Sequence, residues 1–229
     1  MSRHLLSLVL AGMFAGVLPG LFVAGARAQD APARPQTIII GLDLSKSNPL
    51  VEDAAYAARA GTRVVSELDA LPLRSRVMVR TFGVYDSSAN ALKVDEVISA
   101  RARPQAVAEG IGALVSAVPK LVDEGKLKAQ NYTNVISFLE TMSEFIDCDA
   151  SEVRIILLTD GFEDSEYTKL VRGGSLPHPE KLYPGCAELM MLGIGQGGGS
   201  PTVTKRVHDQ WAAWANAAGF QHFTGLYDW

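Results

Sequence analysis

A short apolar run from Thr37 to Leu42 constrains the fold more than any other stretch of this sequence. It reads T-I-I-I-G-L, and a run so short and β-branched is typical of a strand buried on both faces. A second run, Val153 to Asp160 (V-R-I-I-L-L-T-D), has the same character. Such strands occur mostly in parallel sheets covered by helices, so both runs predict an α/β fold.

The rest of the chain alternates further strands and helices. Strands are predicted at 76–82, 92–98, 188–194 and 220–226. The turn-rich link Asp86–Asn90 suits an antiparallel hairpin, which makes 92–98 a half-exposed edge strand. Helices are predicted at 104–127, after Asn134, briefly at 167–171 and before Phe220. Their order predicts a three-layer, doubly wound, mostly parallel sheet with one antiparallel edge strand.

Helical spacing predicts which residues of each helix face the core. The first helix, which Asn48-Pro49 begins and Pro72 ends, is expected to bury Ala54, Ala58, Gly61, Val65 and Leu68. The helix after Asn134 is expected to bury Val135, Phe138, Leu139, Met142 and Phe145. The last helix is expected to bury Val207, Trp211, Trp214 and Ala218.

The first 28 residues have the pattern of a secretory signal peptide: a cationic start, an apolar middle and Ala26-Arg27-Ala28 at the end. The alternative is an uncleaved membrane anchor, but the glycines and proline in the apolar part favour cleavage. Residues 29–36 then form an extended leader, and 37–229 form one domain. This predicts an exported protein, periplasmic or secreted, with no stable membrane insertion after cleavage.

Charge argues against nucleic acid as a partner. The chain has 21 Lys and Arg against 25 Asp and Glu, a net charge of −4. Cleavage after Ala28 would remove Arg3 and Arg27 and no acidic residue, so the mature chain would be more negative. Binding phosphates requires a clustered basic face, which this sequence lacks.

The loop after the first strand carries oxygen donors at alternate positions, Asp43, Ser45 and Ser47. Carboxylates and hydroxyls suit a hard cation, Mg²⁺ first and Mn²⁺ or Ca²⁺ next. Asp160 ends the other buried strand, and parallel neighbours bring their carboxyl ends to one edge of the sheet. The alternative is a turn capped by these polar side chains.

The segments Asp43–Ser47 (D-L-S-K-S), Thr133 and Leu157–Gly161 (L-L-T-D-G) together resemble the von Willebrand factor type A domain. The resemblance extends from about Thr37 to Tyr227. It implies five parallel strands, one antiparallel edge strand and a metal-ion-dependent adhesion site. One departure is that Gln130-Asn131-Tyr132 replaces the glycines that often precede the threonine.

Residue by residue, the resemblance implies that Ser45 and Ser47 bind the metal directly. Asp43 and Asp160 would hold coordinated waters, and Thr133 would bind directly or through water. The alternative for Thr133 is an N-cap of the following helix. The expected function is an exported, non-enzymatic binding module, in which an acidic side chain of a protein partner completes the Mg²⁺ shell.

Two other functional classes remain as alternatives: a metal-assisted hydrolase using the same site, and a structural domain that binds no metal. No convincing nucleophile accompanies the three histidines of the expected mature chain, His178, His208 and His222. Gly193–Gly198 matches G-x-G-x-x-G, but a dinucleotide fingerprint belongs to the first strand–helix turn. We therefore expect a flexible glycine loop beside the metal face.

In the strand order that the resemblance implies, Cys148 and Cys186 lie at the amino end of neighbouring strands, so a disulfide is predicted. Glu163, Asp164 and Glu166 are predicted to form a solvated acidic loop, with a second cation site as the alternative.

Overall fold

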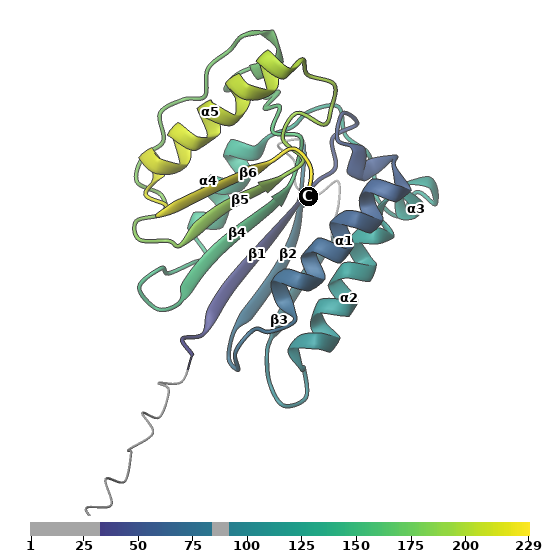
Figure 1. Ribbon diagram of the computed structural model, residues 1–229, viewed down its shortest axis with the longest axis vertical. Coiled ribbons are helices and arrows are strands. Elements are labelled where there is room, and N and C mark those ends of the chain that lie inside the picture. Colours follow the sequence, from purple (N-terminus) through teal and green to yellow (C-terminus); the bar gives the residue numbers. More distant parts are fainter. Residues whose placement is uncertain (1–32, 84–91) are drawn as a thin grey trace, which may run out of the picture. The chain divides into compact units, whose positions relative to one another are not determined.

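The computed structural model describes residues 33–83 and 92–229. In these residues the strands form one six-stranded sheet of order β3-β2-β1-β4-β5-β6 (Figure 1). The strands are β1 (Gln36–Asp43), β2 (Arg76–Phe82), β3 (Lys93–Val97), β4 (Glu152–Leu158), β5 (Glu188–Leu192) and β6 (His222–Leu226). All neighbours pair in parallel except β2 and β3. The predicted mostly parallel sheet with one antiparallel edge strand is confirmed.

Helices cover both faces of this sheet. They are α1 (Ala54–Leu68), α2 (Pro104–Ser116), α3 (Val118–Asp123), α4 (Val135–Ser143) and α5 (Pro201–Ala218), with 3-10 turns η1 (Pro49–Val51) and η3 (Leu170–Arg172). Helices α1 and α2 pack on one face and α4 and α5 on the other (Figure 1). The three-layer arrangement is therefore confirmed.

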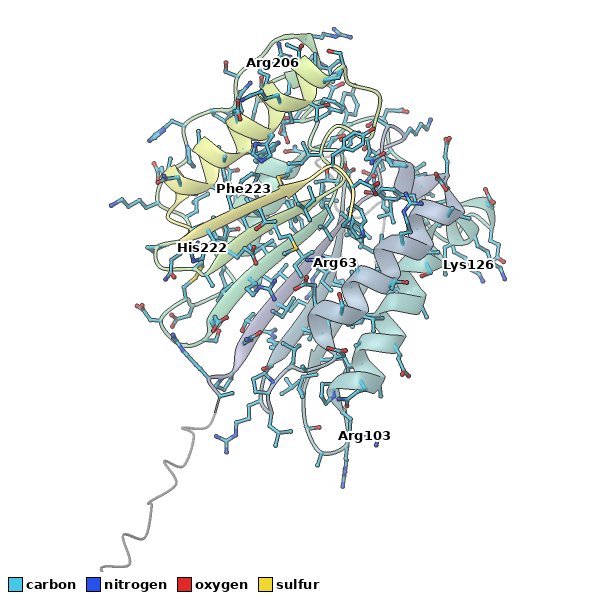
Figure 2. The ribbon with its side chains drawn as sticks, in the orientation of Figure 1. Arg63, Arg103, Lys126, Arg206, His222 and Phe223 are labelled. Atoms are coloured by element: carbon cyan, nitrogen blue, oxygen red, sulfur yellow. A yellow bond between two sulfur atoms is a disulfide. The ribbon has the colours of Figure 1, made fainter. Side chains whose placement is uncertain are left out.

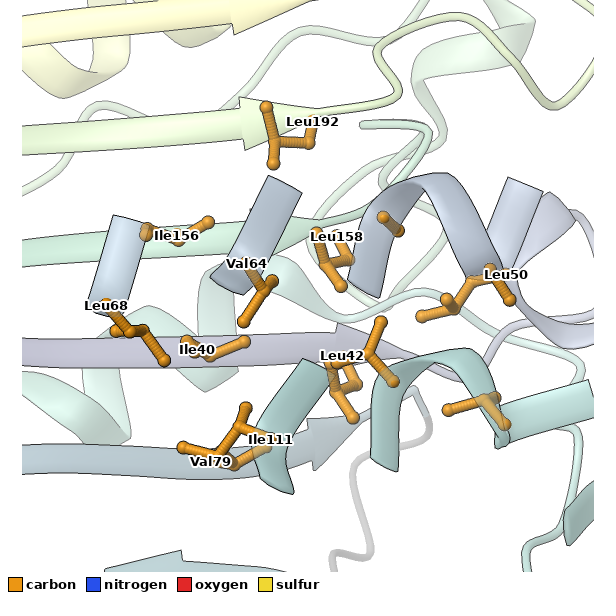
Figure 3. Close-up of a cluster of buried hydrophobic side chains, with 14 of the residues drawn as sticks. Ile40, Leu42, Leu50, Val64, Leu68, Val79, Ile111, Ile156, Leu158 and Leu192 are labelled. Atoms are coloured by element: carbon orange, nitrogen blue, oxygen red, sulfur yellow. The ribbon is translucent and has the colours of Figure 1, made fainter. Parts of the chain in front are cut away.

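The central strand β1 is buried on both faces, as its sequence predicts. Ile40 and Leu42 pack beneath Val64 of α1 (Figure 3), whereas Ile39 faces the layer of α4 and α5. Full burial of each such side chain contributes about 2 kcal/mol. Gly41 permits close packing, because a Cβ there would lie 2.6 Å from Leu157. The hydrophobic effect thus fixes β1 and the loop that follows it.

Three predictions about the helices are wrong in detail. Pro49 starts the 3-10 turn η1, and α1 begins only at Ala54, with Asp53 as its N-cap. The region 104–127 forms two helices, and the short helix expected at 167–171 is the 3-10 turn η3.

The buried faces of the helices also differ from expectation in places. Ala54 and Ala58 are exposed, and Tyr56 is buried instead. Phe145 lies beyond α4 and is 58% exposed. The stripe on α5 is confirmed, since all four of its expected core residues are buried.

The cysteines form the predicted disulfide. The Cα atoms of Cys148 and Cys186 are 5.0 Å apart, and Cys186 is buried against the layer of α4 and α5. The bridge ties the segment before β4 to the start of β5, at the amino end of the sheet.

Some predictions lie outside the described residues, namely the signal peptide at 1–28, the leader up to residue 32 and the hairpin link at 86–90. Within residues 33–83 and 92–229, none of the helices has the length and apolar character needed to cross a membrane.

Candidate metal centre

Asp43 is the last residue of β1, and its side chain is completely buried. Its Oδ1 accepts a hydrogen bond from the Ser45 backbone N–H at 2.8 Å, and its Oδ2 accepts one from the Thr159 hydroxyl at 2.7 Å. Burial, followed by the charge of Asp160, raises the pKa of Asp43 to about 8. Asp43 is therefore a rigidly held carboxylate in an environment that disfavours its charge.

Asp160 follows the end of β4 and is also completely buried. Its Oδ1 accepts a hydrogen bond from the Phe162 backbone N–H at 2.9 Å, but its Oδ2 has no hydrogen-bond partner. Burial raises the pKa of this carboxyl group as well, and the hydrogen bond from the Phe162 N–H partly offsets that rise. A buried carboxylate oxygen without a donor is costly unless something neutralises it.

The two carboxylates lie near each other and lack a cationic partner. In residues 33–83 and 92–229, neither Asp43 nor Asp160 forms an ion pair with Lys, Arg or His. The charge of Asp160 instead contributes to the raised pKa of Asp43. The folded chain thus holds an uncompensated pair of acidic groups at the carboxyl edge of the sheet.

Ser45 and Ser47 lie in the same loop, with hydroxyl oxygens 3.2 Å apart. Ser45 is buried, whereas Ser47 is exposed. One hydroxyl therefore lines the interior of the site, and the other opens toward solvent.

Backbone bridges bring the loop of Thr133 to the same place. The Lys46 N–H donates to the Gln130 carbonyl, and the Gln130 N–H donates to the Leu44 carbonyl, both at 2.8 Å. Thr133 and Asp164 bond to each other's backbones at 3.2 and 3.0 Å. The structure thus joins all three segments that carry the predicted ligands, although metal binding by them stays a prediction.

A glycine loop after β5 closes over Asp160. Gly195 donates its N–H to the Asp160 carbonyl at 2.8 Å. A Cβ on Gly197 would lie 2.3 Å from Asp160 Oδ2 and 2.9 Å from the Ser47 carbonyl oxygen. The glycines therefore permit close approach to a carboxylate, in keeping with a loop beside the metal face.

Sequence reasoning missed two residues that hold the site together. The buried Thr159 hydroxyl donates to Asp43 and accepts a hydrogen bond from the Gly161 N–H at 3.0 Å. The Asn48 side chain donates to the carbonyl oxygens of Asp43 and Leu158, at 3.0 and 2.9 Å. Each residue ties the β1 loop to the end of β4. Their position beside the two acidic motifs was the only sequence signal for this role.

The acidic residues after Asp160 do not form one solvated loop or one shared cation site. Glu163 is fully buried and accepts hydrogen bonds from the first residues of α4. Asp164 pairs with Lys169 at 2.5 Å, and Glu166 accepts from the Asn134 side chain at 3.2 Å. Burial raises the pKa of Glu163 to about 7. The expected solvated loop is therefore wrong for Glu163, which is buried, whereas Glu166 is exposed as expected.

The donors present fit a hard divalent cation. Within the described parts of the chain, no group of three or more His, Cys, Asp and Glu is arranged to hold a metal, so hydroxyl oxygens would have to contribute. Two carboxylates and the hydroxyls of Ser45, Ser47 and Thr133 form the oxygen-only set that Mg²⁺ or Ca²⁺ prefers. The unpartnered Oδ2 of Asp160 is the observation that favours a cation here.

No protein-family model matches this sequence, and no curated protein matches it. The solved structures with a similar fold include the pilus adhesin SpaC from Lactobacillus rhamnosus GG in an open conformation, with 13% identity, a TM-score of 0.47, and 86% of this chain and 28% of that chain covered. Another is the D319A mutant of the PilB minor pilin from Streptococcus sanguinis, with 9% identity, a TM-score of 0.46, and 86% and 58% covered.

A third similar structure is the human COPII-coat protein Sec24c, with 12% identity, a TM-score of 0.39, and 86% of this chain and 30% of that chain covered. This chain spans less than two thirds of the length of each of the three. Likenesses this distant carry no argument about function, which therefore rests on the site itself.

Proposed function

We propose that residues 37–229 form a von Willebrand factor type A domain that binds Mg²⁺ and, through it, a protein partner. The ligand set is Asp43, Ser45, Ser47, Thr133 and Asp160, and Mn²⁺ and Ca²⁺ are further candidates for the same site. The observation that carries the proposal is the unpartnered, buried Oδ2 of Asp160 beside a second buried carboxylate. A divalent cation satisfies that oxygen and removes the repulsion between the two acids.

The donor set also explains how the site can hold a partner. The two aspartates are proposed to hold coordinated waters, and the donors proposed to bind the cation directly are neutral hydroxyls, so the cation would keep positive charge. Bound Mg²⁺ would supply positive charge and a coordination position for an outside oxygen. Ser47 is the exposed member of the set, so an outside oxygen would arrive from its side. An Asp or Glu side chain of a protein partner provides both the charge and the oxygen.

The surface around Ser47 suits protein recognition. Lys46 and Asn131 are exposed there, and Tyr132 is 51% exposed beside Thr133. Exposed tyrosines are enriched at the energetically important positions of protein interfaces. The rim of the site therefore offers contacts in addition to the cation.

Hydrogen bonding at the site favours binding over catalysis. A metal-assisted hydrolase needs a general base beside the cation. Both oxygens of Asp43 are engaged by Ser45 and Thr159, and Asp160 would be occupied in holding a water ligand of the cation. The proposed role is therefore non-enzymatic.

We also propose that the protein is exported, with residues 1–28 as a cleaved signal peptide and 29–36 as a leader. The Cys148–Cys186 disulfide supports this, since stable disulfides belong mainly to oxidising compartments. The mature protein would act in a periplasm or outside the cell.

The metal can be tested by calorimetric titration of the chelator-treated protein with MgCl₂, alongside thermal unfolding in EDTA and in Mg²⁺. Binding should raise the melting temperature, because a ligand that prefers the native state stabilises it. Identical melting curves and no heat of binding would favour the metal-free structural alternative.

The partner can be tested with immobilised wild-type and Asp160→Asn domains exposed to envelope and secreted fractions. A protein retained by the wild type alone and eluted by EDTA is expected. Its Asp and Glu residues can then be replaced in turn to find the carboxylate. Retention that is unaffected by EDTA would contradict recognition through a cation.

A further inference from the structure

Glu163 is a buried carboxylate that the proposed metal centre does not use. Its Oε2 accepts hydrogen bonds from the backbone N–H groups of Val135 at 2.8 Å and Ile136 at 3.3 Å. Its Oε1 accepts one from the Ser165 hydroxyl at 2.6 Å. The side chain is fully buried, and both oxygens are engaged. Glu163 therefore joins the segment after β4 to the N-terminus of α4.

Capping of α4 does not by itself account for Glu163. The Asn134 side chain already accepts a hydrogen bond from the Ser137 N–H at 3.0 Å, which is an ordinary N-cap. Glu163 adds a longer-range bond from another part of the chain, and a negative charge there is favoured by the helix dipole. The extra carboxylate fixes where α4 begins relative to the end of β4.

Thr133 lies within this connection, two residues before α4 starts. On one side its backbone is bridged to Asp164, the residue after Glu163. On the other side the chain enters the helix that the Glu163 carboxylate holds. Glu163 is itself only three residues beyond Asp160, and its N–H donates to the Gly161 carbonyl at 3.1 Å. The distance between Thr133 and Asp160 thus depends on Glu163.

We infer that Glu163 is a positioning residue, which holds Thr133 against Asp160 and so sets the affinity of the site for its cation. This inference rests on the proposed function, because it presumes that Thr133 and Asp160 act on one ion. Groups that orient metal ligands typically change metal affinity 10- to 100-fold when replaced. A residue that acts only on Thr133 should lose its effect once the Thr133 hydroxyl is removed.

The test is a double-mutant cycle on Mg²⁺ affinity, measured by calorimetric titration of MgCl₂ into the full domain. We expect Glu163→Gln to weaken binding about tenfold, Thr133→Ala to weaken it by a similar factor, and the double variant to be no weaker than Thr133→Ala. Ser165→Ala, which removes one bond to Glu163, should weaken binding about threefold. It serves as the milder variant if Glu163→Gln folds poorly.

Two controls separate positioning from general stability. Glu144→Gln changes an exposed acid at the far end of α4 and should bind Mg²⁺ like the wild type. Leu68→Ala makes a cavity in the distant end of α1, so it should lower the melting temperature without changing Mg²⁺ affinity at 25 °C. Wild-type Mg²⁺ affinity in Glu163→Gln would overturn this inference and leave the proposed function intact. So would a loss of affinity in the double variant equal to the sum of the two single losses. No Mg²⁺ binding by the wild type would remove the proposed function and this inference together.

Discussion

Buried acidic side chains are paired with arginine near the amino end of the sheet but not at its carboxyl end. Near the amino end, Arg154 on β4 lies 2.7 Å from Glu67 and 3.0 Å from Glu188. Glu67 also pairs with Arg63 of α1 (Figure 2) at 2.7 Å. At the carboxyl end, Asp43 and Asp160 are more deeply buried and have no cationic side chain beside them in residues 33–83 and 92–229.

The difference distinguishes acids that are paired within the chain, Glu67 and Glu188, from the unpaired acids of the candidate site, Asp43 and Asp160. Acids in the first group are neutralised by the chain itself, so they join α1 to the sheet and need nothing further. Acids in the second group destabilise the fold when they are ionised, and in the proposed function a divalent cation neutralises them. Stability at the amino end should thus be independent of Mg²⁺, and stability at the carboxyl end should depend on it.

The largest expected effect comes from breaking the covalent tie at the amino end. Replacing both Cys148 and Cys186 by Ala opens a loop of 38 residues and should lower the free energy of unfolding by about 3 to 4 kcal/mol. Denaturant unfolding in EDTA measures this loss. Mg²⁺ should raise the melting temperature of the double variant as it does that of the wild type. Loss of the Mg²⁺ response would show that the two ends are coupled.

Asp160→Asn tests the carboxyl end and should act in opposite directions with and without metal. Mg²⁺ affinity should fall about a hundredfold, or roughly 3 kcal/mol, because the variant loses a charged group that would hold a metal-bound water. In EDTA at pH 8 the variant should be at least as stable as the wild type, because the repulsion with Asp43 disappears. Calorimetric titration and thermal unfolding measure the two effects. A variant that is destabilised in EDTA would argue against uncompensated charge.

Arg154→Met should destabilise the protein by about 2 kcal/mol, because it leaves Glu67 and Glu188 without their shared cation. The side chain of Arg154 is 18% exposed, so solvent screens part of the loss. Arg63→Gln is the matched control, since it removes only one of the two cations at Glu67, and it should cost less than about 1 kcal/mol. Denaturant unfolding with and without Mg²⁺ should give equal losses. A loss that Mg²⁺ repairs would contradict the proposed division.

The last expected effect is a pH dependence of the metal-free protein. Folding raises the pKa of Asp43 to about 8 and that of Glu163 to about 7, so the folded state binds these protons more tightly than the unfolded state. This stabilisation is complete at pH values below about 4, the pKa of these groups in the unfolded chain. It is lost as the pH rises through their pKa values in the folded protein. In EDTA the melting temperature should therefore fall between pH 5 and pH 8.

Mg²⁺ should reduce this decrease in melting temperature, because the cation replaces the proton in neutralising Asp43. Thermal scans at several pH values, with and without the metal, give the comparison. A melting temperature in EDTA that rises steadily with pH would falsify the sign of these shifts.

The strands were predictable because they depend on local hydrophobic pattern. Ile38 to Leu42 and Ile155 to Leu158 are apolar throughout, and burial on both faces follows from that alone. The buried face of α1 was less predictable, because a helix rich in alanine shows little contrast between its sides. Tyr56 is buried because its hydroxyl reaches the Leu192 carbonyl at 3.2 Å, a tertiary contact with no sequence signal.

The residues of the candidate site also differ in how well the sequence predicts them. Asp43 and Asp160 could be placed at one edge because each follows a recognisable strand. The role of Glu163 could not be foreseen, because its burial depends on where α4 begins. That start is held by Glu163 together with the bridge between Thr133 and Asp164, which joins two loops far apart along the chain.

The strand order has a consequence for how the protein matures. Ile39 in the centre of the sheet pairs with Ile155, so the middle of the fold closes only after more than half of the chain is available. If the polypeptide crosses a membrane from its amino end, Asp43 emerges long before Asp160 and the glycine loop. In the proposed function, chain order itself would therefore prevent ligand binding before the site is complete.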